Sequence, residues 1–350
     1  MLTTLSDAKI LATGLLVSRG LSADSADRTA WAMVTADAWG KGSHGLLRLP
    51  HYLRRLDVGG IDPVAEMALL RDTGPLAAFD GHGGMGHYQA YRASELATEK
   101  AKRFGVSLVS VANSNHCGVL GLYVLEMVKA EMIGLAFTNG PAVMPAWGGN
   151  TPLVSTSPIA AGIPMGEEAA IIDLATSTVA RGKIAQAASK GETIPDGWAF
   201  DASGTPTNDA KEALNGMLAP MAGAKGFALA LMVEALTGGI VGPSLSSSVA
   251  DPLSSADSSK PQRVSHLLMA IDPAATDPSG GAAGRLYQLA TSITGSGGRI
   301  PGARNYPAEG LDQNSTVEIS DSVAKELAAF AEASSLPLPP SWRGAVQFGS

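Results

Sequence analysis

The feature that most constrains the fold is a change of hydrophobic pattern near residue 75. Before it, apolar residues recur every three or four positions, which predicts helices over 6–20, 22–39 and 44–57. After it, short β-like runs alternate with helical stretches, so we expect an α/β chain with a sheet covered by helices. The predicted strands are Leu76–Phe79, Val106–Val111, Ile133–Thr138, Ile171–Leu174 and Leu267–Ile271. The later predicted helices are 87–103, 119–131, 225–238 and 321–334, and a surface loop is expected over 242–262.

Composition excludes several classes of protein. The net charge of −7 and the lack of any basic run argue against nucleic acid as a partner. No window approaches the roughly 20 uninterrupted apolar residues that cross a bilayer, so we expect no membrane partner. The first 20 residues are typical of an amphipathic helix rather than a signal peptide, and the single Cys117 excludes an intrachain disulfide and a cysteine-rich zinc site. We therefore expect a cytoplasmic protein without a metal.

A literal G-x-G-x-x-G stands at 81–86, between a predicted strand and a predicted helix. A dinucleotide fingerprint also needs an acidic residue after the next strand, to bind the ribose. Here the strand at Val106–Val111 leads into Ala-Asn-Ser-Asn-His, with no carboxylate. We interpret 81–86 as a glycine-rich turn.

The segment Ser43–Tyr52 looks catalytic. On a continuous helix His44, Arg48 and Tyr52 lie at i, i+4 and i+8 and project on one face, opposite the leucines. Arg48 could grip a carboxylate with a forked pair of hydrogen bonds, and His44 could protonate a neighbouring carbonyl. A solvated polar face, with Ser43 as a cap, explains the same residues equally well.

A second histidine, His116, follows a predicted strand and precedes a helix, where α/β proteins place site residues. It is a candidate acid/base or cofactor contact, although a role in capping the helix would also explain it. His82 and His87 are the closest-spaced other pair, and we expect them to face solvent in the glycine turn rather than to bind a metal.

Two further segments could hold phosphate. Ile171–Ser177 is a strand that leads to small hydroxyl residues, and Arg181 and Lys183 add positive charge shortly after it. Lys225 stands at the start of the helix predicted over 225–238, where free amides favour anions. Neither segment is a recognised phosphate loop.

Together these segments resemble the malate/L-lactate/L-sulfolactate dehydrogenase-like family, which also holds ureidoglycolate dehydrogenases, diketogulonate reductases and cyclic-imine reductases. The resemblance covers nearly the whole chain. The residues that carry it are Ser43-His44-Gly45 with Arg48, Asn115-His116, Thr138-Asn139, 145–148 (PAWG), 155–160 (STSPIA), 173–177 (DLATS), 194–198 (IPDGW), Lys225-Gly226 and 299–302 (RIPG).

The resemblance implies an α/β (α+β) fold with a mixed sheet that binds NAD or NADP without a Rossmann fold. It implies a helical lobe from both chain ends, 1–75 plus 285–350, an α/β cofactor lobe over 76–284, and a homodimer. It also implies an oxidoreductase that interconverts a small 2-oxo acid and its 2-hydroxy acid. Among the residues that it assigns, the catalytic ones are His44, Ser43 and, in some members, His116. The substrate residues are Arg48, Tyr52 and Thr156. The cofactor residues are Ala170, Ile171, Ile172, Asp173, Leu174, Ala175, Thr176, Ser177, Arg181, Lys183, Ala224, Lys225, Gly302, Ala303 and Arg304.

The chain departs from the family pattern in three places. Many relatives carry Gly-Thr-Asn-Pro at 155–158 and Asn-Ser at 139–140, whereas this chain has Ser-Thr-Ser-Pro and Asn-Gly. Cyclic-imine reductases carry an aspartate where Lys183 stands, which makes a piperideine- or pyrroline-2-carboxylate reductase the second choice. A hydrolase using Ser43 and His44 ranks lower, because the chain lacks a G-x-S-x-G elbow, and a non-catalytic binding protein ranks with it.

Overall fold

The structure is a computed structural model that describes residues 1–251, 257–303 and 312–343. Its central element is a seven-stranded sheet with the order β2-β3-β4-β13-β5-β8-β9. The pair β3–β4 is parallel and the other neighbouring pairs are antiparallel, so the sheet is mixed. The strands are β2 (Ala68–Asp72), β3 (Leu76–Asp80), β4 (Val106–Ser114), β5 (Ile133–Thr138), β8 (Ile159–Met165), β9 (Glu168–Leu174) and β13 (Val264–Ile271).

All five predicted strands lie in this sheet, and the prediction of an α/β chain with a mixed sheet is confirmed. The sequence did not reveal β2 or β8. The composition of β8 is unusual for a strand because it contains Gly162 and Pro164. A Cβ added at Gly162 would lie 2.7 Å from the Val124 carbonyl oxygen, so the glycine lets a helix pack directly on the strand.

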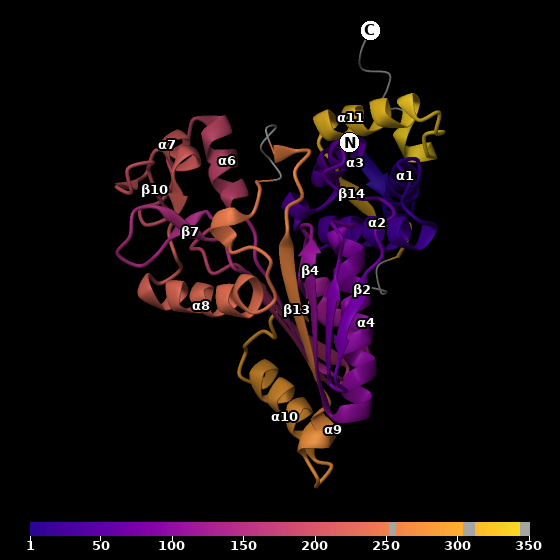
Figure 1. The fold of residues 1–350 in the computed structure, drawn as a ribbon, viewed down its shortest axis with the longest axis vertical. Coiled ribbons are helices and arrows are strands. Elements are labelled where there is room, and N and C mark those ends of the chain that lie inside the picture. The colour runs from indigo at the N-terminus through magenta and orange to yellow at the C-terminus, as the bar shows by residue number, and fades with distance from the viewer. Residues whose placement is uncertain (252–256, 304–311, 344–350) are drawn as a thin grey trace.

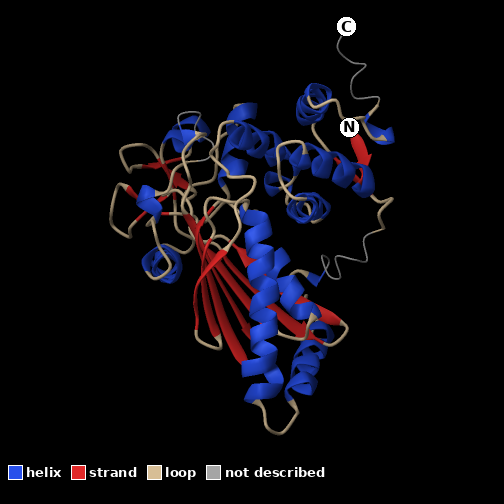
Figure 2. Ribbon diagram, turned by 45° about the vertical axis from the view of Figure 1, so that its right-hand side comes forward, coloured by secondary structure: helices blue, strands red, loops and turns tan. Residues whose placement is uncertain are grey.

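Two helices cover one face of the sheet and form a core with it. They are α4 (Gly86–Phe104) and α5 (Gly121–Lys129), close to the predicted 87–103 and 119–131. Figure 2 shows α4 lying along the strands. The parallel pair β3–β4 is joined through α4, and the turn at 81–86 opens this crossover. Asn115 Nδ2 donates to the carbonyls of Gly83 and Gly84, so the turn packs on the end of β4.

The first and last segments of the chain share a second core. It contains α1 (Leu5–Val17), α2 (Ala23–Ala38), α3 (Leu49–Asp57) and α11 (Asp321–Ala333), and β1 (Leu2–Thr4) pairs with β14 (Thr316–Glu318). Figure 1 shows these elements together at the end of the sheet toward which β4 points. The side chain of Thr4 caps the N-terminus of α1, and that of Ser22 caps α2.

A third group of elements lies beside the sheet and has its own small core (Figure 1). Its helices are α6 (Arg181–Lys190), α7 (Ala210–Asn215) and α8 (Ala224–Glu234), and α8 continues into a π turn at Ala235–Gly239. Its strands are β6 (Met144–Pro145), β7 (Pro152–Val154), β10 (Ala199–Phe200), β11 (Pro206–Thr207) and β12 (Met217–Leu218). Only α8 of the three helices was predicted.

At the opposite end of the sheet from α11, α10 (Ala282–Gly295) packs against β8, and the short α9 (Pro273–Thr276) precedes it. Short 3₁₀ turns complete the described chain at Gly42–His44, Leu46–Arg48, Ser246–Ser248 and Pro340–Trp342. The division into two lobes remains a prediction. None of the helices in the described ranges is both long and apolar enough to cross a membrane.

Candidate active site

The predicted continuous helix over 44–57 is wrong at its start. Two 3₁₀ turns, Gly42–His44 and Leu46–Arg48, precede α3, and Gly45 separates them with φ −88° and ψ −149°. The cause is Asp37 on α2, whose Oδ2 accepts a hydrogen bond from Leu46 N at 2.8 Å. A Cβ added at Gly45 would lie 1.9 Å from Asp37 Oδ1, so only glycine lets the chain wrap this carboxylate. Burial raises the pKa of Asp37 to about 6.

His44 nevertheless reaches a second imidazole. Its ring stacks on that of His116, with 5.6 Å between centroids and 27° between planes. Ser43 Oγ lies 2.9 Å from His44 Nδ1, which leaves His44 Nε2 as the other hydrogen-bonding atom of the ring. Burial, reinforced by the charge of Arg48, lowers the pKa of His44 to about 4. The ring is therefore neutral at pH 7.

His116 is held from several sides. Tyr52 Oη lies 2.6 Å from His116 Nδ1, and Gly118 N donates to the same nitrogen at 3.4 Å. A backbone N–H can only donate, so Nδ1 is an acceptor and the neutral ring carries its proton on Nε2. His116 N donates to Gln262 Oε1 at 3.0 Å. Burial and the neighbouring His44 lower the pKa of His116 well below its ordinary value.

Arg48 lies beside this pair. Its Nε donates to the Ser43 carbonyl at 2.8 Å, which ties the guanidinium to the residue before His44. Throughout the described part of the chain, no carboxylate pairs with Arg48. Its position and charge suit a substrate carboxylate next to the two imidazoles.

The expectation that His87 faces solvent is wrong. His82 is exposed in the turn, but His87 points inward from α4 and is only 1% exposed. Its ring meets that of Tyr52 edge-on, with 5.1 Å between centroids, and both of its nitrogens are buried without a hydrogen-bond partner. Burial lowers its pKa to about 3. The residues next to His87 in the sequence do not reveal its burial, because burial depends on which face of α4 the side chain lies on.

The structure joins several predicted cofactor residues along β9. Lys41, three residues before His44, forms an ion pair with Asp173 Oδ2 at 2.7 Å. Pro301 O accepts from Ile171 N, and a Cβ on Gly302 would lie 2.4 Å from the Ile171 carbonyl oxygen. Ala303 follows directly, and Arg304 lies outside the described residues. The predicted segments 170–174 and 302–303 are thus adjacent.

The strip after β9, residues 175–177, lies near the start of α8. Thr176 donates to the Thr156 carbonyl through both N and Oγ1, and its own carbonyl accepts from Met221 N, shortly before α8. Ala224 and Lys225 are exposed at the start of α8. The connection to the strip is made by Met221, three residues before Ala224, and not by the histidines. Ala175 and Ser177 flank Thr176 in this strip.

The start of α6 comes close to the histidine pair. A Cβ added at Gly182 would lie 3.7 Å from Ser43 Cβ, and the flanking Arg181 and Lys183 are exposed. Neither α6 nor α8 has a side-chain cap at its N-terminus. Within residues 1–251, 257–303 and 312–343, no group of three or more histidine, cysteine or carboxylate side chains could hold a metal ion.

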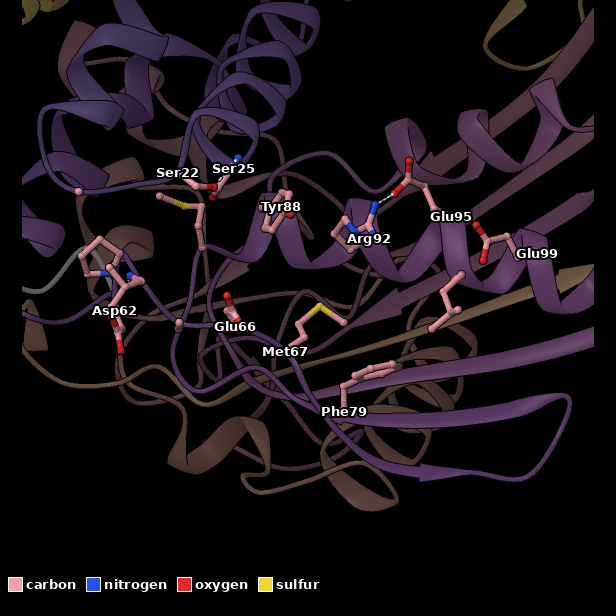
Figure 3. A pocket seen from close by; sticks show the side chains of 16 residues that line it. Ser22, Ser25, Asp62, Glu66, Met67, Phe79, Tyr88, Arg92, Glu95 and Glu99 are labelled. Carbon is pink, nitrogen blue, oxygen red and sulfur yellow. Dashed lines mark hydrogen bonds and ion pairs between the residues drawn. The ribbon is translucent and has the colours of Figure 1, made fainter.

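A cavity of about 600 Å³ beside α4 is separate from this site (Figure 3). Carboxylates stand around it and Met67 and Phe79 lie at its apolar side, as the figure shows. None of the residues predicted for catalysis or for cofactor binding lines it. Its carboxylates are Asp62, Glu66, Glu95 and Glu99, with Arg92 bound to Glu95. An anionic substrate would be repelled there.

Comparison with known proteins places the chain in a family. The profile of the Malate/L-lactate dehydrogenase family matches residues 4–328. The chain belongs to this family. It is therefore an oxidoreductase of the dehydrogenase type.

Curated relatives of this dehydrogenase carry several substrate names. A malate/(S)-sulfolactate dehydrogenase of Methanothermus fervidus is 39% identical over 274 residues, 78% of this chain and 80% of the relative. A (2R)-3-sulfolactate dehydrogenase (NADP(+)) of Chromohalobacter salexigens is 36% identical over 333 residues, 94% and 97% of the two chains. A Delta(1)-pyrroline-2-carboxylate reductase 1 of Burkholderia ambifaria is 31% identical over 308 residues, 87% of this chain and 90% of the relative.

A solved structure has the same fold. The sulfolactate dehydrogenase from Methanocaldococcus jannaschii aligns with a TM-score of 0.89 at 30% identity, covering 97% of this chain and 98% of that one.

Proposed function

We propose that this chain is an NAD(P)-dependent dehydrogenase that interconverts a small 2-oxo acid and the matching 2-hydroxy acid. One observation carries the proposal: two stacked neutral imidazoles, His44 and His116, lie beside the guanidinium of Arg48. A carboxylate bound to Arg48 would place the adjacent carbon and its oxygen next to the imidazoles. That is the arrangement that oxidation of a 2-hydroxy acid requires.

The two histidines have different roles in this proposal. The tautomer of His116, with its proton on Nε2, suits a fixed donor that hydrogen-bonds and orients the substrate oxygen. His44 then moves the proton: the neutral ring accepts it from the hydroxyl in oxidation and returns it in reduction. Ser43 steadies His44 through Nδ1, and Tyr52 acts on the substrate through His116.

The residues present fit a dinucleotide. Two helix starts, α6 and α8, lack side-chain caps and carry Arg181, Lys183 and Lys225 in their first turns, which suits phosphates. Asp173 on β9 pairs with Lys41, three residues before His44, and Gly302 packs against Ile171 of the same strand. A bound nicotinamide would supply or accept the hydride, while the chain's own residues bind and orient the acid. The mixed sheet order supports a binding mode outside the parallel Rossmann type.

Relatives named for malate and sulfolactate favour a substrate with a second anionic group. The relative named for pyrroline-2-carboxylate supports a different reaction, reduction of a cyclic imine. The imine comes second, because Lys183 is a cation and cannot serve as a carboxylate in a proton relay near Ser43. The absorbance assay described below, run with both cofactors, also decides between NAD and NADP.

We further propose a homodimer with a helical lobe from both chain ends, in the cytoplasm. The apolar side chains of α8 and the turn after it support a covering partner, because Leu231, Met232 and Ile240 are all exposed. Size-exclusion chromatography with light scattering tests the dimer. A monomer at micromolar concentration would contradict it.

The decisive assay follows absorbance at 340 nm with pyruvate, oxaloacetate, sulfopyruvate, ureidoglycolate, diketogulonate and cyclic imines, each with both cofactors. Consumption of NADH or NADPH with a 2-oxo acid supports the proposal, and consumption with an imine alone favours an imine reductase. Ester hydrolysis without cofactor would point to a hydrolase, and cofactor binding without turnover to a binding protein.

Two variants test the residue roles. His44→Ala is expected to lower kcat by about 10²- to 10⁴-fold with cofactor binding nearly intact, because the proton-transferring group is lost. Arg48→Lys is expected mainly to raise KM, since lysine cannot form a forked pair. His82→Ala, in the exposed turn, is the matched control. Normal turnover by His44→Ala would remove His44 from the mechanism.

A further inference from the structure

Arg55, on α3, is a buried cation that the proposed chemistry does not use. It is 0% exposed, and burial lowers its pKa. Its guanidinium donates to four acceptors, none of them a carboxylate oxygen: the carbonyls of Gly60 (2.7 Å), Lys260 (3.0 Å) and Asp257 (3.3 Å), and Asn115 Oδ1 (3.1 Å). Burying a charge is unfavourable unless such bonds offset the loss of hydration. If the position served only packing in the core, an apolar residue such as leucine would be more favourable there.

The four acceptors lie on three separate segments, and the chain is shaped to bring them together. Gly60 follows α3, Asn115 follows β4, and Asp257 and Lys260 belong to a segment about 200 residues further along. A Cβ added at Gly60 would lie 2.0 Å from the Ser258 carbonyl oxygen, so the close approach requires glycine. One planar guanidinium therefore fastens three segments at a single point.

The segments that contain Asn115 and Asp257 also hold His116, and so does α3, which carries Arg55. Asn115 directly precedes it in the chain. The segment from Asp257 to Lys260 leads to Gln262, whose Oε1 accepts from His116 N at 3.0 Å. On α3 itself, Tyr52 lies one turn before Arg55 and meets His116 Nδ1 at 2.6 Å. The backbone nitrogen, the preceding residue and the ring of His116 are thus all held by segments that meet at Arg55.

We infer that Arg55 is a positioning residue for His116. Without touching the substrate, it fixes the ring so that Nδ1 accepts from Tyr52 and Gly118 and Nε2–H faces the substrate oxygen. Nη2 of Arg55 meets the acceptors on Gly60, Asn115 and Lys260, and Nη1 meets the Asp257 carbonyl. A lysine ammonium ends one bond short of Nη2 and has no second nitrogen in the place of Nη1, so it cannot reproduce this set of bonds. This inference rests on the proposed function for the role of Nε2, but the orientation of the ring can be measured without turnover.

The test measures the ring nitrogens of His116 by ¹⁵N NMR in the full-length, cofactor-free protein, with His116→Gln for assignment. The wild type is expected to show the Nε2–H tautomer. Arg55→Lys is expected to mix in the Nδ1–H tautomer and to move the pKa of His116 back toward its ordinary value. Gln262→Leu, which removes one acceptor but no charge, is expected to act in the same direction more weakly.

Kinetics supply the second readout. Arg55→Lys is expected to lower kcat about 10- to 100-fold while KM for the 2-oxo acid changes little, because a small misplacement of an orienting group slows the reaction step. Added guanidinium at low millimolar concentration is expected to restore part of kcat in Arg55→Ala. Arg54→Lys is the matched control: Arg54 is the exposed neighbour, paired with Glu326, and its replacement is expected to change neither readout.

The outcomes separate the two claims. If Arg55→Lys and Gln262→Leu lower the melting temperature but keep the wild-type tautomer, Arg55 serves only the core and the inference is wrong. If the tautomer changes as expected but the wild type turns over no substrate, the proposed function fails and the positioning role survives. If Arg55→Ala does not fold, Arg55→Lys and Gln262→Leu still decide.

Discussion

At the scale of single residues, the site depends on environment more than on residue type. His44 and His116 are stacked imidazoles, yet one meets a serine hydroxyl and the other a buried tyrosine and a backbone amide. A third, His87, lies at the edge of Tyr52 with no partner at either nitrogen. Burial lowers the pKa values of all three, so all three rings are uncharged at neutral pH.

The pH dependence should differ between free enzyme and complex. Burial and Arg48 hold the pKa of His44 at about 4 in the free chain, and a substrate carboxylate on Arg48 would offset the second cause and raise that pKa. Oxidation needs neutral His44, so the acidic limb of kcat should lie at higher pH than the acidic limb of kcat/KM. Profiles of 2-hydroxy acid oxidation between pH 4 and 8, corrected for substrate ionisation, check this. Coincident limbs would argue against Arg48 as the carboxylate site.

Gly45 offers a second residue-scale prediction. Gly45→Ala drives a methyl group into the Asp37 carboxylate, so the bond to Leu46 N is lost or the 3₁₀ turn shifts. We expect the free energy of unfolding to fall by about 1–3 kcal/mol and kcat to drop as His44 moves. Urea unfolding and initial rates measure both. Gly284→Ala is the control: nothing lies within 4 Å of its added Cβ on α10, and it should be neutral or slightly stabilising.

The sequence revealed the residues of this site better than their geometry. His44, Arg48 and Tyr52 stood out because polar types interrupt a leucine pattern, but the break at Gly45 depends on a carboxylate eight residues earlier. Arg55 escaped notice because a pair of arginines on a helix usually faces solvent, and here one faces inward. Which arginine is buried depends on the segment at 257–260, far away in the chain.

At the scale of elements, strand identity was predictable and strand order was not. Runs of β-branched and apolar residues predict β4, β5 and β13, but nothing local says that β13 inserts between the other two. His266 on β13 makes contacts that favour this place. Its Nδ1 and Nε2 each lie 2.9 Å from a hydroxyl, Thr138 Oγ1 on β5 and Ser114 Oγ on β4. A buried polar group of this kind is satisfied by only one arrangement of neighbours.

Gly302 tests the contact between β9 and the segment after α10. It has φ +72°, and its added Cβ would meet the Ile171 carbonyl at 2.4 Å. Gly302→Ala should therefore displace this segment from β9 and raise Kd for NADH or NADPH, measured by nucleotide fluorescence. Gly297→Ala is the matched control, because its φ is +81° but nothing lies within 4 Å. If both variants lose the same affinity, the cause is backbone strain at positive φ, and the contact of Gly302 with β9 does not contribute to cofactor binding.

At the scale of the whole molecule, the buried histidines form a common acid-sensitive feature. His87 and His266 are each 1% exposed, and burial is the main cause that lowers their pKa values to about 3 and about 4. His44 and His51 are held at about 4 and His116 well below its ordinary value. They connect the helical elements, α4 and the sheet, so protonation would disturb contacts between elements as well as the site.

Stability should therefore fall on acidification through the range from pH 6.5 to about 4. Above pH 6.5 the histidines are neutral in both the folded and unfolded states, so burying them costs no stability through protonation. Below it, the unfolded chain takes up protons that the folded chain cannot, so each fully buried histidine costs about 1.4 kcal/mol per pH unit. Asp37 acts in the opposite direction, since its raised pKa of about 6 lets the folded state bind a proton first, but it is one group against five.

Urea unfolding at pH 7.5, 6.5, 5.5 and 4.5 measures the slope of the free energy of unfolding against pH. His266→Asn should reduce that slope. A free energy of unfolding that stays flat across the range would mean that the buried rings accept protons without loss of packing.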